Sequence, residues 1–379
     1  MVTWASAVAL TAAGAFRYAP RLQLQAEIPP AAVLVTATVA AVLARGRRIR
    51  LVAFTMAVCA VLAMAAVPWH WGAADIDVFY LMQSASDALL HGQNPYTTTL
   101  AARGATGPSA LHFHYLYFPG AALIAAPGRL LGAVRVMSVV AFAVLIAFVV
   151  RLARNSPGEH ARAVKLLALC LSLPTTAAMV HWAWVDVYSV AGLAGWLAFR
   201  QQHQRWSIAL LAMSLSIKPT ILIALVPAVL WSRRARRESS VAAVIAVALI
   251  LPFVLITGPR AFYEDLVGVH ITEGFRSDAL VLSAWSYQLT GRLIPVAISL
   301  VAGALLAYVA LRRRPADLAD NMIAAAFLST AAFLLSQGAF LNYYFIPLWL
   351  LVLAIAGQGV TFDVAADIRL PVPGGRHVS

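Results

Sequence analysis

At residues 75–80 the chain reads Asp75-Ile76-Asp77-Val78-Phe79-Tyr80, in the middle of its longest polar interval, which runs from Trp69 to about Tyr117. The interval continues with Gly92-Gln93-Asn94-Pro95-Tyr96 and closes with His112-Phe113-His114-Tyr115-Leu116-Tyr117-Phe118-Pro119. Apolar runs stand on both sides of it. The stretch is therefore a polar interval between two groups of apolar segments, and the side of the membrane on which it lies decides how those segments are arranged.

The composition is that of a membrane protein. Hydrophobic residues make up 62% of the 379 residues and charged residues 11%, with a mean hydropathy of +0.81. A soluble domain carries about 25% charged residues. Many apolar runs have the length of about 14–20 residues that a bilayer demands. We expect an all-α, polytopic transmembrane helical bundle of about 9–12 membrane helices, including re-entrant or interfacial segments.

The formal net charge of +13 is explained by topology. Seventeen of the 28 Lys and Arg residues fall in five short clusters between apolar runs. Such clusters mark the cytoplasmic face under the positive-inside rule, so nucleic-acid binding is not expected. The clusters are Arg45/Arg47/Arg48/Arg50, Arg151/Arg154/Arg162/Lys165, Arg200/Arg205, Arg233/Arg234/Arg236/Arg237 and Arg312/Arg313/Arg314.

These clusters place the interval 70–115 outside the membrane. The apolar segment 118–131 is broken by Pro and Gly, so we expect it to dip in or lie flat, which keeps the cluster after 133–150 cytoplasmic. Residues 1–357 then form one membrane domain, and 358–379 form a cytoplasmic tail. The apolar runs are 1–16, 29–44, 51–69, 133–150, 166–180, 187–199, 206–231, 241–257, 293–311, 321–336 and 343–357.

Two local patterns refine this layout. Residues 77–91 have helical periodicity with one apolar stripe, which favours a helix lying in the membrane interface and ending at Gly92. Residues 206–231 contain Lys218-Pro219 and have Arg at both ends. Because Pro disfavours the helical conformation at the residue before it, this run is predicted to be a V-shaped pair of half-helices with Lys218 near the apex.

The carboxylates at the start of the 77–91 helix are the leading candidates for chemistry. Asp77, or alternatively Asp75, could act as a general base beside a substrate hydroxyl. The competing interpretation is that both are solvated residues of a first helical turn, where Asp is favoured. Neither alternative is excluded by the carboxylates themselves.

Other polar residues could complete a site on the same side. Lys218 is costly between apolar half-helices unless it lines a polar cavity, and it could contact a phosphate. His112 and His114 could bind a phosphate or sugar, or be ordinary interfacial side chains; without a third ligand a metal is not expected. His181, Asp186, Arg276, Asn342 and Tyr343 could contribute, although each taken alone fits a structural role as well.

No nucleotide-binding loop, nucleophile elbow or metalloprotease motif occurs in the sequence. Cys59 and Cys170 both lie within apolar runs and suggest neither a metal site nor a disulfide. This pattern fits an enzyme without cofactors whose activated donor arrives dissolved in the lipid.

At this point the motifs resemble a known family. The order Asp75-Ile76-Asp77-Val78-Phe79-Tyr80, then Leu89-Leu90-His91-Gly92-Gln93-Asn94-Pro95-Tyr96, then Tyr117-Phe118-Pro119 resembles the GT-C superfamily. It is most similar to the polyprenol-phosphate-mannose-dependent mannosyltransferases of glycosyltransferase family 87. Ser216-Ile217-Lys218-Pro219 and Asn342-Tyr343-Tyr344 fit the same family, and the resemblance covers about residues 51–357. The chain departs from it in having two apolar segments, rather than one, ahead of 51–69.

The resemblance implies an activity. A polyprenyl-phosphate sugar, most often mannose, would serve as donor, and a cell-envelope glycolipid or glycan would accept the sugar with inversion at the anomeric carbon. Asp77 or Asp75 would be the base in the external loop at about 70–117. Lys218, His112, His114 and Arg276 would bind the donor phosphate, and Tyr80, Asn94, Tyr96, Asp186, Asn342 and Tyr343 the substrates.

Other functional classes stay open. The chain could be a non-catalytic transporter or flippase of lipid-linked glycans, although it shows no convincing internal repeat of helix groups. It could also be an envelope-assembly protein that has lost activity on this scaffold. The Ala- and Arg-rich composition suggests a bacterial plasma membrane, and membrane lipids are the other expected partners.

Overall fold

The computed structural model describes residues 77–98, 100–102, 111–113, 115–154, 170, 174–268, 275–336, 338–360 and 362. Several expectations fall outside these residues: the apolar runs 1–16, 29–44 and 51–69, the candidate base Asp75, His114, and residues 363–379 of the tail.

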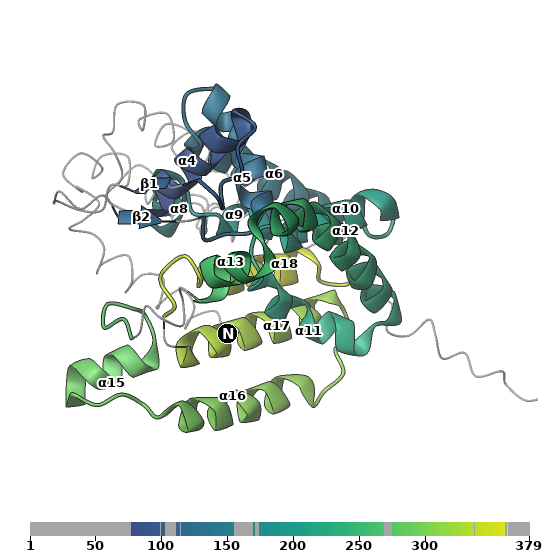
Figure 1. Cartoon of the computed structure of the whole chain (residues 1–379). Helices are drawn as coiled ribbons and strands as arrows, with labels where there is room; N and C mark the ends of the chain where they lie inside the picture. The colour runs from purple at the N-terminus through teal and green to yellow at the C-terminus, as the bar shows by residue number, and fades with distance from the viewer. Residues whose placement is uncertain are drawn as a thin grey trace, which may run out of the picture.

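The described chain is helical apart from one short antiparallel pair of strands (Figure 1). In that pair Leu100 is opposite Phe113 and Ala102 is opposite Leu111. The elements up to the mid-chain are α4 (Asp77–Leu90), β1 (Leu100–Ala102), β2 (Leu111–Phe113), α5 (Pro119–Leu130), α6 (Arg135–Arg154), α8 (Pro174–His181), α9 (Asp186–Phe199) and α10 (Gln204–Leu215). The later ones are α11 (Ile221–Trp231), α12 (Arg233–Thr257), α13 (Pro259–Tyr263), the π-helix η3 (Glu264–Gly268), α15 (Leu282–Thr290), α16 (Val296–Leu311), α17 (Leu318–Leu335) and α18 (Phe345–Ala356).

Three of the described helices, α6, α12 and α17, are long and apolar enough to cross a membrane, with 20, 25 and 18 residues. They match the expected runs at 133–150, 241–257 and 321–336. The helix α5 has 12 residues, about 18 Å of length, which is short of the bilayer core of about 30 Å. This length fits the expectation that 118–131 does not cross completely.

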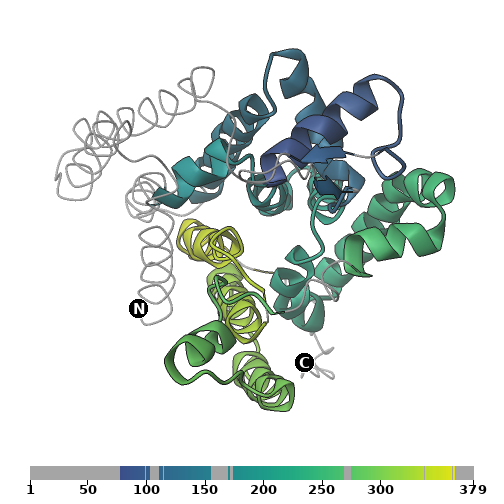
Figure 2. The ribbon, with the colours of Figure 1, turned by 60° about the vertical axis from the view of Figure 1, so that its left-hand side comes forward.

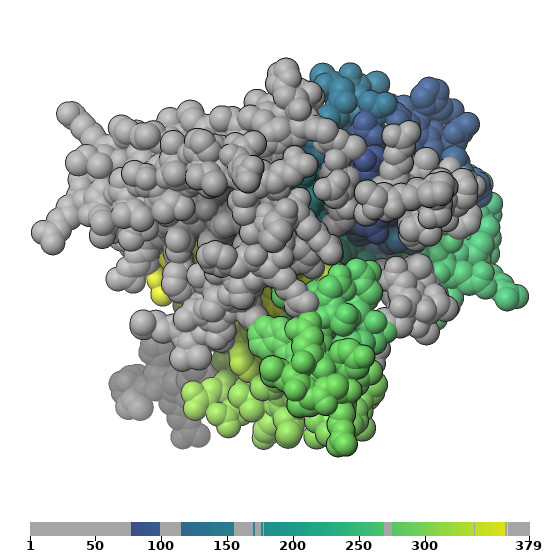
Figure 3. Space-filling view, turned by 90° about the vertical axis from the view of Figure 1, so that its left-hand side faces the viewer, coloured from purple at the N-terminus to yellow at the C-terminus, as the bar shows by residue number. Residues whose placement is uncertain are grey.

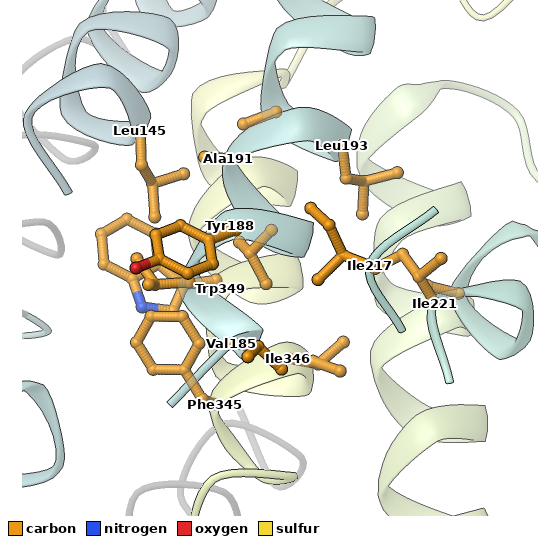
Figure 4. Packing of buried hydrophobic residues seen from close by; sticks show 14 of the residues in the cluster. Leu145, Val185, Tyr188, Ala191, Leu193, Ile217, Ile221, Phe345, Ile346 and Trp349 are labelled. Carbon is orange, nitrogen blue, oxygen red and sulfur yellow. The ribbon is translucent and has the colours of Figure 1, made fainter. Parts of the chain in front are cut away.

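Helix α9 is the buried centre of the described structure. Thirteen of its 14 residues are buried, and it packs against α6, α10 and α18. Gly192 allows this close approach, because a Cβ atom there would lie 2.7 Å from the backbone oxygen of Leu210 in α10. On the α18 side, Tyr188 lies with Phe345 and Trp349 (Figure 4). A fully covered helix of this kind can hold polar side chains away from lipid and water.

Helices α10 and α11 form the predicted V. The apex contacts the start of α9, because Lys218 bonds to Asp186. Both feet lie at the end of α9: Ser207 in α10 donates a hydrogen bond to the backbone oxygen of Trp196, and Ser232 after α11 is bonded to Arg200. The expected break at Lys218-Pro219 and the return to the same end are thus confirmed.

Two boundaries differ from the expected layout. Helix α12 starts at Arg233 rather than near residue 241, since the side chain of Ser232 caps it by accepting a hydrogen bond from the Ala235 N–H at 3.1 Å. Its first turns therefore include the basic cluster that was expected to form a loop. Helix α15, Leu282–Thr290, was not expected at all; its residues are too mixed in polarity to stand out among the apolar runs.

The C-terminal helices form the second part of the bundle. Helices α18, α17 and α16 lie side by side in that order (Figure 2). No residue of α16 is buried, although the helix is strongly apolar. In the space-filling view of Figure 3, α15 and α16 are the green to yellow-green atoms at the lower edge of the molecule. Apolar residues exposed in this way are what a lipid-facing surface carries.

Helix α4 has the expected amphipathic form. Val78, Leu81, Met82 and Ala85 are buried, and the helix packs against α5. The hydroxyl of Tyr115 contacts the Met82 sulfur at 3.4 Å. The chain leaves the helix at Gly92, whose φ of 70° is readily adopted by glycine. The predicted helix stop is confirmed.

Candidate functional site

A buried set of polar contacts joins three distant parts of the chain. The Lys218 ammonium lies 2.9 Å from Oδ1 of Asp186, and Nδ2 of Asn342 donates to Oδ2 of the same carboxylate at 2.9 Å. The ammonium also lies 3.9 Å from the centre of the Tyr343 ring. We call Asp186, Lys218, Asn342 and Tyr343 the Lys218 cluster. The structure thus brings together four residues that the sequence nominated separately.

The cluster is enclosed. The exposed fractions of Asp186, Lys218 and Asn342 are 0%, 5% and 7%. Their neighbours along the chain, Val185 and Ile217, are buried apolar side chains (Figure 4). A buried cation and a buried carboxylate are stable only when they satisfy each other and their remaining hydrogen-bonding groups.

Pro219 and Gly120 explain why the chain presents Lys218 here. Pro219 has no N–H to continue a helix, so α10 ends and α11 begins only after the turn. The N–H of Gly120 in α5 donates to the backbone oxygen of Ser216 at 3.0 Å. Any Cβ atom at residue 120 would lie 2.3 Å from Oγ of Ser216, so only glycine allows this contact.

Several helices begin at or near the Lys218 cluster. Helix α9 starts at Asp186, α11 starts three residues after Lys218, and α18 starts two residues after Tyr343. Helix α5 is anchored there through Gly120. The first N–H groups of a helix carry partial positive charge and attract anions. Together with the Lys218 ammonium, these helix starts make a region suited to a negatively charged group.

The backbone just before Asp186 is unusual. Ala183 has a φ of 52°, in the left-handed region that residues other than glycine rarely adopt. It lies in the short turn from α8 into α9, where the N–H of Trp184 bonds to the oxygen of Met179 at 3.0 Å. Strained backbone of this kind tends to occur near functional residues, where the surrounding structure holds it.

Asp77 stands at the first position of α4 and is half-buried. Its Oδ1 accepts a hydrogen bond from the N–H of Val78 at 2.8 Å, and it has no ion-pair partner among the residues that the structure describes. Asp186, by contrast, is held by a cation and an amide. Of these two carboxylates, Asp77 is the one without a bonded cation or side-chain amide among the described residues.

Tyr117 connects Asp77 with the Lys218 cluster. Burial raises the pKa of its phenol well above the usual value, and the negative charges of Asp77 and Asp186 raise that pKa further. Tyr343 of the cluster acts on it as well. Both carboxylates therefore lie close enough to act on one hydroxyl group, so the candidate base and the buried ion pair share the neighbourhood of Tyr117.

Arg135 lies beside α4, the helix that begins with Asp77. Its guanidinium carbon is 4.1 Å from the centre of the Phe79 ring, and its Nε donates to the backbone oxygen of His181 at 2.7 Å. Burial, and next to it the charge of Arg135, lower the pKa of His181 to about 4. His181 is therefore neutral at pH 7. The ring of Tyr80, a predicted substrate ligand, packs edge-on against Phe79.

Asn94 and Tyr96 are used in the scaffold. Asn94 accepts the N–H of Tyr96 at 3.1 Å and donates to Oγ1 of Thr257 at the end of α12 at 2.9 Å. The Tyr96 hydroxyl donates to the backbone oxygen of Tyr117, and its ring packs on Phe262. These contacts hold the loop after α4 against α12 and α13. Substrate binding by the two residues stays a prediction.

Arg276 is placed near the cluster but outside it. Its guanidinium makes a two-pronged bond to Asp278, at 2.9 and 3.0 Å, and lies 5.0 Å from the Phe340 ring. The segment after it is tied to the loop of Asn342, because the N–H of Leu280 donates to the oxygen of Ala339 at 2.8 Å. Its predicted contact with a donor phosphate is not tested by these positions.

The histidine predictions are left open. Only the backbone of His112 is described, opposite Ala101 in the strand pair, and His114 lies outside the described residues. In the part of the chain that the structure describes, no three His, Cys, Asp or Glu side chains come together as a metal site would require. No residue arrangement there points to a bound cofactor.

Two residues of this region were not singled out from the sequence. Tyr117 was part of the quoted Tyr117-Phe118-Pro119 motif, whose position just before a broken apolar segment was the available signal. Arg135 was a lone cation at the edge of an apolar run, a position that is costly without partners and therefore informative. Comparison of the chain with protein-family models, with curated proteins and with solved structures finds no match.

Proposed function

We propose that this chain is a polytopic membrane glycosyltransferase of GT-C type. It transfers a sugar, with mannose as the first candidate, from a polyprenyl-phosphate donor to a glycolipid or glycan of a bacterial envelope. The observation that supports this most is that two carboxylates act on Tyr117: Asp77, which has no ion-pair partner among the described residues, and Asp186, which is bonded to the buried Lys218 ammonium.

Asp77 and Lys218 match the two charges that such a reaction moves. The oxygen of the acceptor hydroxyl attacks the anomeric carbon, and its proton passes to the Asp77 carboxylate. The bond between the anomeric carbon and the phosphate oxygen breaks, and the polyprenyl phosphate leaves with the electron pair. Lys218 and the neighbouring helix starts stabilise the negative charge that grows on this phosphate.

The surroundings favour a lipid-borne donor. Three described helices are apolar enough to cross a membrane, and α16 is strongly apolar with no fully buried residue. A polyprenyl chain can approach such a surface directly from the bilayer. The phosphate at the end of that polyprenyl chain would then have to leave the membrane surface and enter the region of Lys218.

The donor class is tested by comparing donors on purified protein in lipid nanodiscs. We expect radiolabelled mannose to be transferred to extracted envelope lipids from polyprenyl-phosphate-mannose and not from the nucleotide sugar GDP-mannose. Addition of a metal chelator should leave the rate unchanged.

Two results would contradict the proposed function. Absence of transfer from any polyprenyl-phosphate sugar, together with measurable translocation of lipid-linked glycans across the vesicle membrane, would show a transporter instead. Transfer from the nucleotide sugar would contradict the lipid-borne donor.

A further inference from the structure

Asp186 is fully buried and bonded to a neighbour through each of its two oxygens. One of its oxygens is bonded to the Lys218 ammonium and the other to the Asn342 amide, each at 2.9 Å. The side chain is fully buried at the first position of α9. Because it is enclosed and already holds two neighbours, this carboxylate is better placed to act on Lys218 and Asn342 than on an incoming sugar.

Lys218 is oriented by two different elements. One N–H of its ammonium points to Asp186 in α9, and the face of Tyr343, which precedes α18, lies 3.9 Å from the nitrogen. An ammonium has three N–H donors, so these contacts leave donor capacity for a further acceptor. The long, flexible lysine side chain would otherwise sample many rotamers.

We propose that Asp186 is a positioning residue that keeps the Lys218 ammonium charged and aimed at the donor phosphate, and that Asn342 in turn fixes Asp186. This inference rests on the proposed function, because it takes a polyprenyl phosphate as the anion that Lys218 receives. It assigns to Asp186 and Asn342 a role in holding the cation, in place of the direct substrate contacts expected from the sequence.

The physical reason lies in burial. A cation moved from water into a low-dielectric interior is strongly disfavoured unless an opposite charge lies beside it. Among the described residues, the titratable groups that act on Lys218 are Asp186 on α9 and Tyr343 before α18. Tyr117 before α5 is acted on by both of them and by Asp77 of α4. Of these described groups, only Asp186 is both negative and in contact with the ammonium. Without it, the amine would give up its proton more readily.

The test measures binding of farnesyl phosphate, with uncharged farnesol as the control ligand, at about pH 7.5 and about pH 9. Wild-type protein should prefer the phosphate equally at both pH values. In Asp186→Asn the affinity should fall, by about tenfold or more at the higher pH, because the lysine is then partly neutral. Asp186→Glu should restore the flat pH profile with a reduced affinity, since the charge is kept and the ammonium is displaced.

Further variants separate positioning from general damage to the fold. Asn342→Ala keeps both charges, so its affinity should fall at both pH values without a new pH dependence. The double variant with Asp186→Asn and Lys218→Met removes both charges, and it should bind weakly and independently of pH. Asp87→Asn, whose carboxylate pairs with Arg129 at 2.6 Å on the outer part of α4, is the matched control and should behave as wild type.

The outcomes are distinguishable. If wild type prefers the phosphate and Asp186→Asn keeps both its affinity and its pH profile, the positioning role is overturned while the proposed donor class stands. If Asp186→Asn does not fold, Asp186→Glu and Asn342→Ala decide, and unchanged affinity in both overturns the role. If wild-type protein binds farnesol as well as farnesyl phosphate, the donor class itself is overturned.

Discussion

At the scale of single residues, Gly120 sets how closely α5 can approach the turn that carries Lys218. A Cβ atom there would lie 2.3 Å from Oγ and 2.5 Å from the backbone oxygen of Ser216. Ala usually stabilises a helix relative to Gly by up to about 1 kcal/mol. In Gly120→Ala the backbone must move apart instead, at a cost of about 1–3 kcal/mol.

We therefore expect Gly120→Ala to lower the Tm in detergent and to weaken transfer. Gly338→Ala is the control, because a Cβ atom there meets no atom within 4 Å. Equal melting temperatures for Gly120→Ala and wild type would show that α5 does not need this close contact.

The sequence could nominate the residues of the site but not their partners. Lys218, Asp186 and Asn342 each stood out as polar groups beside apolar runs. Their mutual bonds span 32 and 156 residues of chain, and no local pattern carries that information. For the same reason the buried role of Tyr96 could not be foreseen, since its ring packs on Phe253 and Phe262, far along the chain.

At the scale of elements, Glu238 holds the first turns of α12 against the end of α9. Its carboxylate accepts hydrogen bonds from Nε of Arg200 at 2.7 Å, Nε1 of Trp196 at 2.9 Å and Nε of Arg234 at 2.8 Å. The Glu238 side chain is fully buried. Glu238→Gln removes the negative charge that both arginines share, which for a buried pair costs about 3–5 kcal/mol.

We expect Glu238→Gln to lower the Tm strongly and to leave the affinity of the folded protein for farnesyl phosphate unchanged, because α9 separates the two sites by about 20 Å. The control is Glu264→Gln, whose partner Arg260 is 92% exposed, and which should not change the Tm measurably. A Tm for Glu238→Gln equal to that of the control would refute the role given to this network.

Element positions were predictable where periodicity or a strong breaker was present. The helix at 77–90, its stop at Gly92 and the break at Lys218-Pro219 follow from apolar spacing, Gly and Pro. The sequence predicts a start of α12 near residue 241, because the four arginines before it are typical of a loop, whereas the helix begins at Arg233. Their charge is neutralised in part by Glu238 and their first turn is capped by Ser232, both of which are tertiary or capping effects.

At the scale of the whole molecule, the described structure has two polar ends joined by α9: the Lys218 cluster at its start and the Arg200–Glu238 network at its end. The positive-inside rule predicts that the arginine-rich end faces the cytoplasm and the Lys218 cluster the outside. After replacement of Cys59 and Cys170, Gln93→Cys should react with a membrane-impermeant maleimide on intact cells. Gln202→Cys should react only after permeabilisation, and the opposite pattern would invert the topology.

In the proposed reaction, Asp77 takes the proton of the acceptor hydroxyl. The most direct measurement is single-turnover transfer of labelled mannose from polyprenyl-phosphate-mannose by Asp77→Asn, with Asp87→Asn on the same helix and Asp75→Asn run beside it. A lost general base lowers the rate by about 10²–10⁴-fold. We predict that loss for Asp77→Asn, with a near wild-type rate for Asp87→Asn. Transfer at the wild-type rate in Asp77→Asn would contradict the role of Asp77 as the base, and transfer lost only in Asp75→Asn would assign that role to Asp75.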